Sequence, residues 1–111
     1  MPHLLPISRG ELETIVVELD DEPPEAGDVL GWYAEDYEGW GFEEARPDPP
    51  HIAHVANTNR ARLSAAVDGR TGKILLFAVV DNLLKGAAGA AVQNMNLALG
   101  YPEDLGLEHL K

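Results

Sequence analysis

The sequence predicts an α+β domain with two helices packed on one face of a mostly antiparallel sheet, in the order β-β-α-β-β-β-α. Three observations support this class. Residues 11–19 are rich in β-branched side chains, residues 61–80 contain two apolar runs joined by an Asp-Gly turn, and residues 28–38 and 82–99 keep apolar side chains at helical spacing. With 111 residues, the chain is expected to form a single domain over residues 1–111.

The remaining strands follow from composition along the chain. Residues 2–7 are apolar and carry two prolines, which suits an edge strand. The segment HIAHVANTN, residues 51–59, is expected to be a short strand. The run KILLFAVV, residues 73–80, is apolar at both alternating sets of positions, so we place it in the interior of the sheet.

Capping residues predict where the helices begin and end. Asp28 is the expected N-cap of the first helix, and Gly39 can end it in the left-handed conformation. For the second helix, Asp81 or Asn82 is the expected cap and Gly100 the stop. This helix lies within DNLLKGAAGAAVQNMNLALG, which is poor in bulky residues and rich in amides. Its small residues permit another backbone to approach closely.

The chain carries a net charge of −11, concentrated in its first half. This acidic balance argues against nucleic-acid binding, which needs Lys and Arg to neutralise phosphates. Its simplest explanation is a solvated acidic surface, and the alternative is a match to a basic protein partner. The sequence shows neither an apolar run of the roughly 20 residues needed to span a bilayer nor a signal peptide, so we expect no membrane contact and a cytoplasmic location.

Few residues suggest chemistry by spacing alone. The chain has no cysteine, so it contains neither a thiolate nucleophile nor a cysteine-ligated metal site. His51 and His54 form an HxxH pair, but an extended segment would point them to opposite faces, so no metal site is expected. The motif KGAAG has only Lys85 as a nearby cation, so phosphate binding there has weak support. No catalytic residue is expected within this chain.

Aromatic and acidic residues cluster between positions 32 and 44. They form a candidate contact surface for a protein partner, because aromatic anchors inside a polar rim are common in interfaces. The alternative is that most of the aromatic residues fill the core while the acids solvate a helix. The candidate contact residues are Trp32, Trp40, Phe42, Glu43 and Glu44.

Three segments of the chain together resemble one known family. DNLLKGAAGAAVQNMNLALG is similar to the family's DNLVKGAAGQAVQNMN, and PHLLPISRGELET is similar to its PHLVPMNRGIL strand. A weaker match relates YAEDYEGWGF and HVANTN to the family's spaced tyrosines with PFV and to its VxGSN. The chain thereby resembles the C-terminal portion, about the last third, of N-acetyl-γ-glutamyl-phosphate reductases. The resemblance implies a catalytic domain of the glyceraldehyde-phosphate-dehydrogenase type.

Members of this family use NADPH to reduce an acyl phosphate to an aldehyde through a cysteine thioester in arginine biosynthesis, and a close relative acts in lysine biosynthesis. The resemblance implies that the nucleotide-binding domain and the catalytic cysteine are absent from this chain. The chain alone is therefore expected to hold no cofactor and to be inactive. The resemblance also implies that Asn82 faces the nicotinamide, that Lys85, Gly86 and Gly89 border the cofactor site, and that Arg9 lies near the substrate.

Departures from the family keep a second hypothesis open. The family's RGIL is RGEL at residues 9–12, its PFV is replaced at residues 41–43, and the Gln of GAAGQA is Ala90. Charge stands where the family is apolar, as expected if formerly buried surfaces face water or a new partner. The first hypothesis is a reductase fragment whose partner is the missing nucleotide-binding domain. The second is a non-catalytic protein-binding module, natural or engineered.

Overall fold

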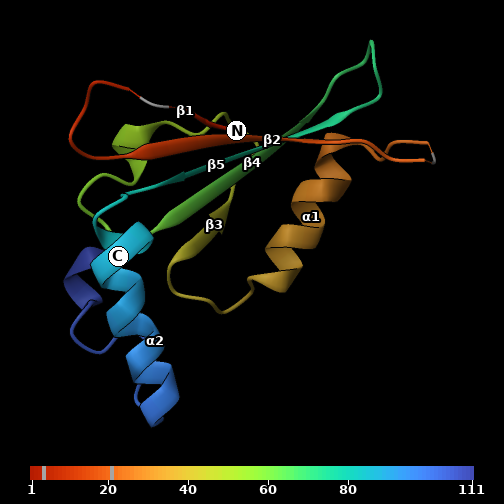
Figure 1. The fold of residues 1–111 in the computed structure, drawn as a ribbon. Helices are drawn as coiled ribbons and strands as arrows, with labels where there is room; N and C mark the ends of the chain where they lie inside the picture. Colours follow the sequence, from red (N-terminus) through yellow and green to blue (C-terminus); the bar gives the residue numbers. More distant parts are fainter. Residues whose placement is uncertain (4, 21) are drawn as a thin grey trace.

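A five-stranded sheet is the central layer of the fold (Figure 1). The computed structural model describes residues 1–3, 5–20 and 22–111. Its strands are β1 (Pro2–His3), β2 (Glu11–Val17), β3 (Glu43–Ala45), β4 (Ala61–Val67) and β5 (Ile74–Val80). They lie in the order β1-β2-β5-β4-β3, and neighbours are antiparallel except for the parallel pair β3 and β4. The predicted α+β class with a mostly antiparallel sheet is confirmed.

The hairpin of β4 and β5 forms the middle of the sheet, as predicted. Strand β5 is third in the order and pairs with β2 on one side and β4 on the other. In the turn, the Asp68 carboxylate accepts a hydrogen bond from the Arg70 amide at 3.0 Å, and Gly72 has a φ of 70°. A tight turn between two strands favours a side chain that hydrogen-bonds the backbone of the turn. It also favours a residue that can adopt a positive φ.

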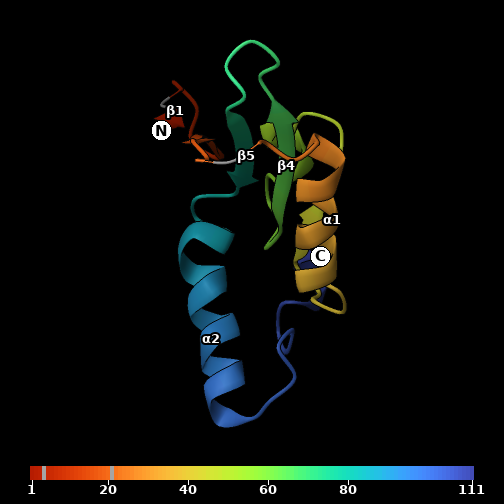
Figure 2. The ribbon, with the colours of Figure 1, turned by 90° about the vertical axis from the view of Figure 1, so that its right-hand side faces the viewer.

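Helix α1 (Ala26–Asp36) covers part of one face of the sheet (Figures 1 and 2). Its buried Val29 packs with Ala65 of β4 and Ile74 of β5 in the hydrophobic core. The helix begins earlier than predicted, because Glu25 is the N-cap and Asp28 lies inside the first turn. The Asp28 carboxylate accepts from the Glu25 amide at 3.1 Å. An acidic group in the first turn also interacts favourably with the helix dipole.

The third strand lies elsewhere than predicted. Residues 51–59 form a 3₁₀ turn at Ile52–His54 followed by further turns, and the neighbour of β4 is β3 instead. Two ring nitrogens explain the difference. His51 Nδ1 accepts from the Ala53 amide at 3.0 Å, and His54 Nδ1 accepts from the His51 amide at 3.1 Å. Because these amides are satisfied locally, the segment does not need a strand partner.

Helix α2 (Gly89–Leu99) continues from the end of β5 away from the sheet (Figures 1 and 2). A π-helical turn, Leu84–Ala88, links β5 to α2, and Gly100 ends the helix with a φ of 72°, as predicted. The expectation that both helices pack on one face is therefore wrong for α2. Its amides bond the following loop instead, since Asn96 Nδ2 donates to two backbone carbonyls there at 3.0 and 2.9 Å.

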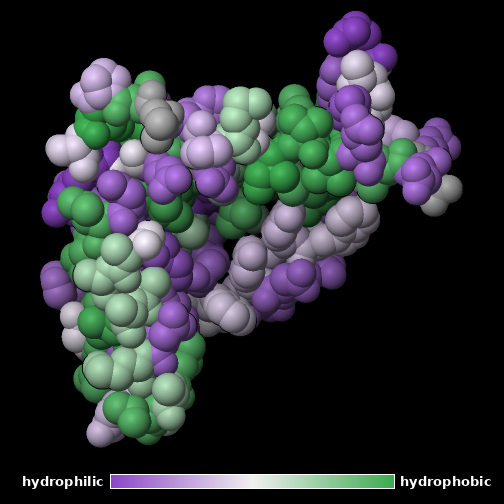
Figure 3. Space-filling view, viewed as in Figure 1, coloured by the Kyte–Doolittle hydropathy of each residue, from purple (hydrophilic) through white to green (hydrophobic). Residues whose placement is uncertain are grey.

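Large apolar side chains remain exposed at the sheet edge and along α2 (Figure 3). The edge strand predicted over residues 2–7 is confirmed only as β1, and Leu4 lies outside the described residues. The adjacent β2 exposes Ile15 on one face and Val16 on the other. Exposed apolar patches commonly mark contact surfaces. On α2 the exposed apolar residues are Met95, Leu97 and Leu99.

Candidate functional site

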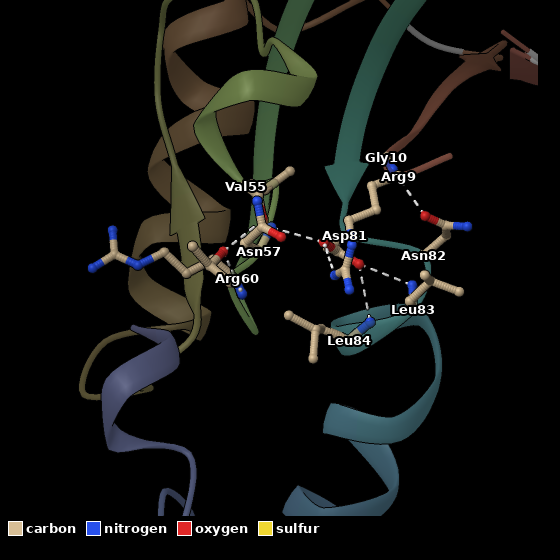
Figure 4. Close-up of polar contacts among 10 residues, drawn as sticks. Arg9, Gly10, Val55, Asn57, Arg60, Asp81, Asn82, Leu83 and Leu84 are labelled. Atoms are coloured by element: carbon tan, nitrogen blue, oxygen red, sulfur yellow. Dashed lines mark hydrogen bonds and ion pairs between the residues drawn. The ribbon is translucent and has the colours of Figure 1, made fainter. Parts of the chain in front are cut away.

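The chain makes a polar turn where β5 ends, and Asp81 is its centre (Figure 4). The Asp81 side chain is 0% exposed, yet both its oxygens are hydrogen bonded. Oδ2 accepts from the Asn57 amide at 2.7 Å and from Arg9 Nη1 at 3.0 Å. Oδ1 accepts from the amides of Leu83 and Leu84 at 2.9 and 3.1 Å. One carboxylate therefore joins three segments that are distant in sequence.

The surroundings of Asp81 favour its ionised form. Burying a carboxylate costs free energy unless charge and hydrogen bonds compensate for it. Burial raises the pKa of Asp81, but the hydrogen bonds from the Asn57 amide and from Arg9, followed by those from the two amides after the strand, lower it by more. The pKa of Asp81 thus lies below its ordinary value. At neutral pH the side chain is a pure hydrogen-bond acceptor.

Two residues with positive φ meet at this turn. Asn57 has a φ of 64°, and its amide is one of the donors to Asp81. Gly10 has a φ of 103°, and its amide donates to Asn82 Oδ1 at 2.8 Å. A Cβ on Gly10 would lie 2.0 Å from Ile52 Cγ2, so the position requires glycine. Asn82 thereby ties the segment before β2 to the start of the helical region.

A second polar cluster connects α2 and the π-helical turn before it to β3 and to the segment before β4. Lys85 Nζ pairs with the Glu43 carboxylate and donates to Gln93 Oε1 at 2.8 Å. The buried Asn59 donates through Nδ2 to the same Gln93 oxygen at 3.1 Å. Gln93 Nε2 in turn donates to the carboxylate of Glu103 in the loop after α2. These contacts account for several of the unusual polar residues in this helix.

Two glycines bring the helical region close to its neighbours. The Gly86 amide donates to the backbone oxygen of Asp81 at 2.9 Å. A Cβ on Gly86 would meet only ordinary contacts, the nearest at 3.5 Å, whereas a Cβ on Gly89 would lie 2.0 Å from Asn59 Oδ1. Only glycine fits at position 89 without displacing the buried amide. The small residues of this helix thus permit close packing within the domain itself.

The structure gathers into one corner all five residues that the family resemblance pointed to. Arg9 and Asn82 belong to the turn around Asp81, and the other three lie on the helical region that follows it. Asp81 was predicted only as a helix cap, and its contact with Arg9 was not predicted. The available signal was an acidic residue directly after a strand that is apolar on both faces. The five residues are Arg9, Asn82, Lys85, Gly86 and Gly89.

The candidate partner-contact residues separate into two groups. Trp32 and Trp40 are 55% and 53% exposed, so they remain available for contact. Phe42 is 1% exposed, and the Glu43 carboxylate pairs with the lysine of the second cluster. Phe42 and Glu43 are therefore corrected to interior residues, because packing and an ion pair occupy their side chains. Glu44 forms ion pairs with two arginines and is partly exposed.

His51 and His54 lie side by side in the 3₁₀ turn. Their rings contact each other edge to face with centroids 5.9 Å apart, rather than pointing to opposite faces, because the segment is a 3₁₀ turn. In the described part of the chain, no group of three or more His, Cys, Asp or Glu side chains is placed to hold a metal ion. Across those same residues, every helix is too short or too polar to cross a membrane.

Comparison with known proteins relates this geometry to a family. A family model described as "Semialdehyde dehydrogenase, dimerisation domain" matches residues 1–82. The chain belongs to this family. The matched range of this semialdehyde dehydrogenase dimerisation domain includes all five strands, Arg9 and Asp81, and it ends at Asn82.

Individual relatives agree with the family. An N-acetyl-gamma-glutamyl-phosphate reductase of Rubrobacter xylanophilus is 79% identical over 111 residues, which are 100% of this chain and 32% of that protein. The reductase of Geobacter metallireducens is 46% identical over 98% of this chain and 32% of its own length. The solved aspartate semialdehyde dehydrogenase II of Vibrio cholerae, complexed with ASA, has a TM-score of 0.65 and 27% identity, covering 86% of this chain and 28% of that chain.

The chain spans about a third of the length of the curated relatives it matches. The resemblance to the C-terminal portion of N-acetyl-γ-glutamyl-phosphate reductases is confirmed by the family match and by identity over the whole chain. The alternative of a natural or engineered binding module finds no support in these comparisons.

Proposed function

We propose that this chain is a portion of an N-acetyl-γ-glutamyl-phosphate reductase, an oxidoreductase that reduces an acyl phosphate to a semialdehyde in arginine biosynthesis. The observation that carries the proposal is the 79% identity, over every residue of the chain, to a reductase of that name. Since the chain has no cysteine, a thioester-forming nucleophile has to come from the remainder of the reductase. We therefore propose that the chain alone is inactive and that the whole enzyme is cytoplasmic.

NADPH is the cofactor that the family implies, and Asn82 fits its nicotinamide end. Because Asn82 Oδ1 accepts from Gly10, its Nδ2 is left to donate to the carboxamide oxygen of the cofactor. Lys85 fits a direct contact less well, since Glu43 and Gln93 already occupy its Nζ. We therefore assign Asn82 to cofactor binding, and assign Lys85 and Gly89 to positioning the helical region that borders the site, in which Gly86 also lies. When bound, NADPH supplies the hydride.

Arg9 is the proposed contact for the acyl phosphate. Its side chain is 39% exposed, and Asp81 accepts from only one of its terminal nitrogens. A guanidinium group has five N–H donors in a planar fork, so the remaining donors can bind a phosphate or carboxylate group. This arrangement places a permanent cation beside Asn82, the proposed cofactor contact.

The exposed apolar surfaces suggest the partners of the domain. We infer that the remainder of the reductase, including its nucleotide-binding domain, covers the apolar side of α2. We infer further that β2, which exposes Ile15 and Val16, contributes to contact with a second copy. The description of the matching family as a dimerisation domain supports this second inference. A separate basic protein partner is not needed to explain either surface.

A chimeric enzyme tests the proposal directly. This chain would replace the matched third of the Rubrobacter xylanophilus reductase, and turnover would be followed through NADPH consumption with N-acetyl-γ-glutamyl phosphate. We expect activity close to that of the parent enzyme and a dimer in sedimentation experiments. The isolated chain is the control, and it should consume no NADPH above the blank. A folded chimera without activity contradicts the proposed function, and an active monomer contradicts the inferred self-contact.

A further inference from the structure

We propose that Asp81 is a positioning residue of the reductase reaction, which orients the Arg9 guanidinium for binding the acyl phosphate. The inference rests on the proposed function and deepens it, because it explains how a partly exposed arginine keeps one orientation. Figure 4 shows the Arg9 side chain directed toward the Asp81 carboxylate at the end of β5.

Backbone hydrogen bonds hold the Asp81 carboxylate in place. Three backbone amides, from Asn57, Leu83 and Leu84, donate to its two oxygens at distances of 2.7 to 3.1 Å. The backbone oxygen of Asp81 accepts in turn from the Gly86 amide. A carboxylate held by backbone groups from two segments presents a fixed oxygen to any further donor.

The Arg9 side chain needs a fixed partner to keep one orientation. A free arginine side chain has many rotamers, and ordering it costs about 2 kcal/mol of conformational free energy. Only one terminal nitrogen bonds Asp81 Oδ2, and the side chain remains 39% exposed, so the other donors are available. The neighbouring Gly10 is fixed as well, through its bond to Asn82. The guanidinium is thus restrained by an ion pair at its tip and by the backbone at its base.

Arg9 also belongs to the lining of an apolar hollow. The hollow has a volume of about 530 Å³, and Ile7, Leu12, His51 and Ile52 contribute to the same lining. Among the described residues on this lining, Arg9 is the only side chain with a permanent charge. An oriented cation at the border of an apolar hollow suits a ligand with an anionic group and a short carbon chain, which is the chemistry of an acyl phosphate.

An amide cannot replace this carboxylate. Four N–H groups converge on Asp81, and an ionised carboxylate accepts from all of them, whereas asparagine must point its NH₂ group at one pair of donors. The amides of Leu83 and Leu84 on one oxygen, and that of Asn57 on the other, belong to the backbone and cannot withdraw. Two backbone amides thus compete with one for the side-chain oxygen of an asparagine, and Arg9 is the one donor that can move into solvent. Asp81→Asn is therefore expected to keep its oxygen toward the helical region and to release Arg9.

The experiment uses steady-state kinetics of the chimeric reductase and its Asp81→Asn variant. We expect the KM for the acyl phosphate to rise on the order of tenfold, as for the loss of one hydrogen bond to a charged group, while the KM for NADPH stays near the parent value. Arg9→Met should also raise the KM for the acyl phosphate. In the double variant, Asp81→Asn should add nothing to the effect of Arg9→Met, because its action passes through that side chain.

Controls separate positioning from general damage. Asp68→Asn changes another hydrogen-bonded aspartate at the opposite end of the β4–β5 hairpin and should leave both KM values unchanged. An unchanged KM for the acyl phosphate in folded Asp81→Asn overturns the inference. Equal rises in both KM values, or additive effects in the double variant, overturn it as well.

If Asp81→Asn does not fold, the Arg9→Lys variant provides the test. It keeps the charge but loses the planar fork, so a raised KM supports the inference and an unchanged KM overturns it. An inactive parent chimera refutes the proposed function instead.

Discussion

Helices α1 and α2 each contain 11 residues, but the fold holds them by different interactions. Helix α1 lies on the sheet and contributes Val29 to a core with Ala65 and Ile74. Helix α2 extends beyond the end of the sheet, and its buried residues are a glycine and two amides, Gly89, Gln93 and Asn96 (Figure 2).

The difference shows which kind of interaction fixes the position of each helix. Apolar burial is proportional to area and has little directional preference, so α1 is held by the amount of surface it covers. Hydrogen bonds and ion pairs are directional, so α2 is held by a few contacts of defined geometry, such as those of Gln93 with Asn59 and of Asn96 with the following loop. A helix near a proposed cofactor site benefits from the second kind of attachment, because orientation matters there more than buried area.

The largest expected effect is in the core beneath α1. Ile74→Ala removes a buried side chain between Val29 and Ala65 and should lower the free energy of unfolding by about 2–5 kcal/mol. Urea unfolding followed by circular dichroism measures the loss. Leu19→Ala is the control, since truncating a large apolar side chain at an exposed position after β2 should cost about 1 kcal/mol or less. Equal losses at the two positions would contradict the placement of the core.

A smaller effect is expected where α2 passes the buried amide. In Gly89→Ala, the added Cβ would lie 2.0 Å from Asn59 Oδ1, and forcing it in should cost about 1–3 kcal/mol. Gly86→Ala is the control three residues earlier, where the Cβ meets only ordinary contacts. There the better helix propensity of alanine should leave stability unchanged or raise it by up to about 1 kcal/mol. A tolerated alanine at position 89 would show that α2 is not held closely against Asn59.

The smallest expected effect is the acid dependence of the polar turn. Because the folded pKa of Asp81 lies below its ordinary value, the carboxylate stabilises the fold at every pH above the unfolded pKa of about 3.9. This contribution is lost as the pH falls through the folded pKa, at about 1.4 kcal/mol for each unit by which the pKa is lowered. Unfolding free energies measured between neutral and acid pH should therefore fall more steeply for the parent chain than for Asp81→Asn.

Concentrated NaCl provides the control for this measurement. Glu18 and Asp104 also have lowered pKa values, caused first by hydrogen bonds from Lys73 and Lys111, but both pairs are at the surface and are screened by salt. The buried turn is screened much less. A pH dependence that disappears entirely in salt would assign the acid sensitivity to the surface pairs rather than to Asp81.

Residues of the candidate site could be predicted from the sequence only where they lie in a segment that resembles a known family. Residues such as Asn82 and Gly89 belong to a run of sequence long enough to be matched, although their roles toward cofactor and substrate remain predictions. The contact between Arg9 and Asp81 was not predictable from spacing, because the two residues are 72 positions apart. Their proximity depends on β2 and β5 being neighbours in the sheet.

The sequence by itself determined the elements whose signals are local. The β4–β5 hairpin, the interior position of β5 and the end of α2 at Gly100 follow from alternation, turn residues and capping, which act within a few positions of the chain. The turn at residues 51–59, which the sequence analysis did not foresee, depends on local hydrogen bonds of the His51 and His54 rings. Tertiary structure alone decided that β3 pairs with β4 and that α2 leaves the sheet. These outcomes depend on hydrogen bonds and ion pairs between distant segments, and only the folded chain brings those partners within reach of one another.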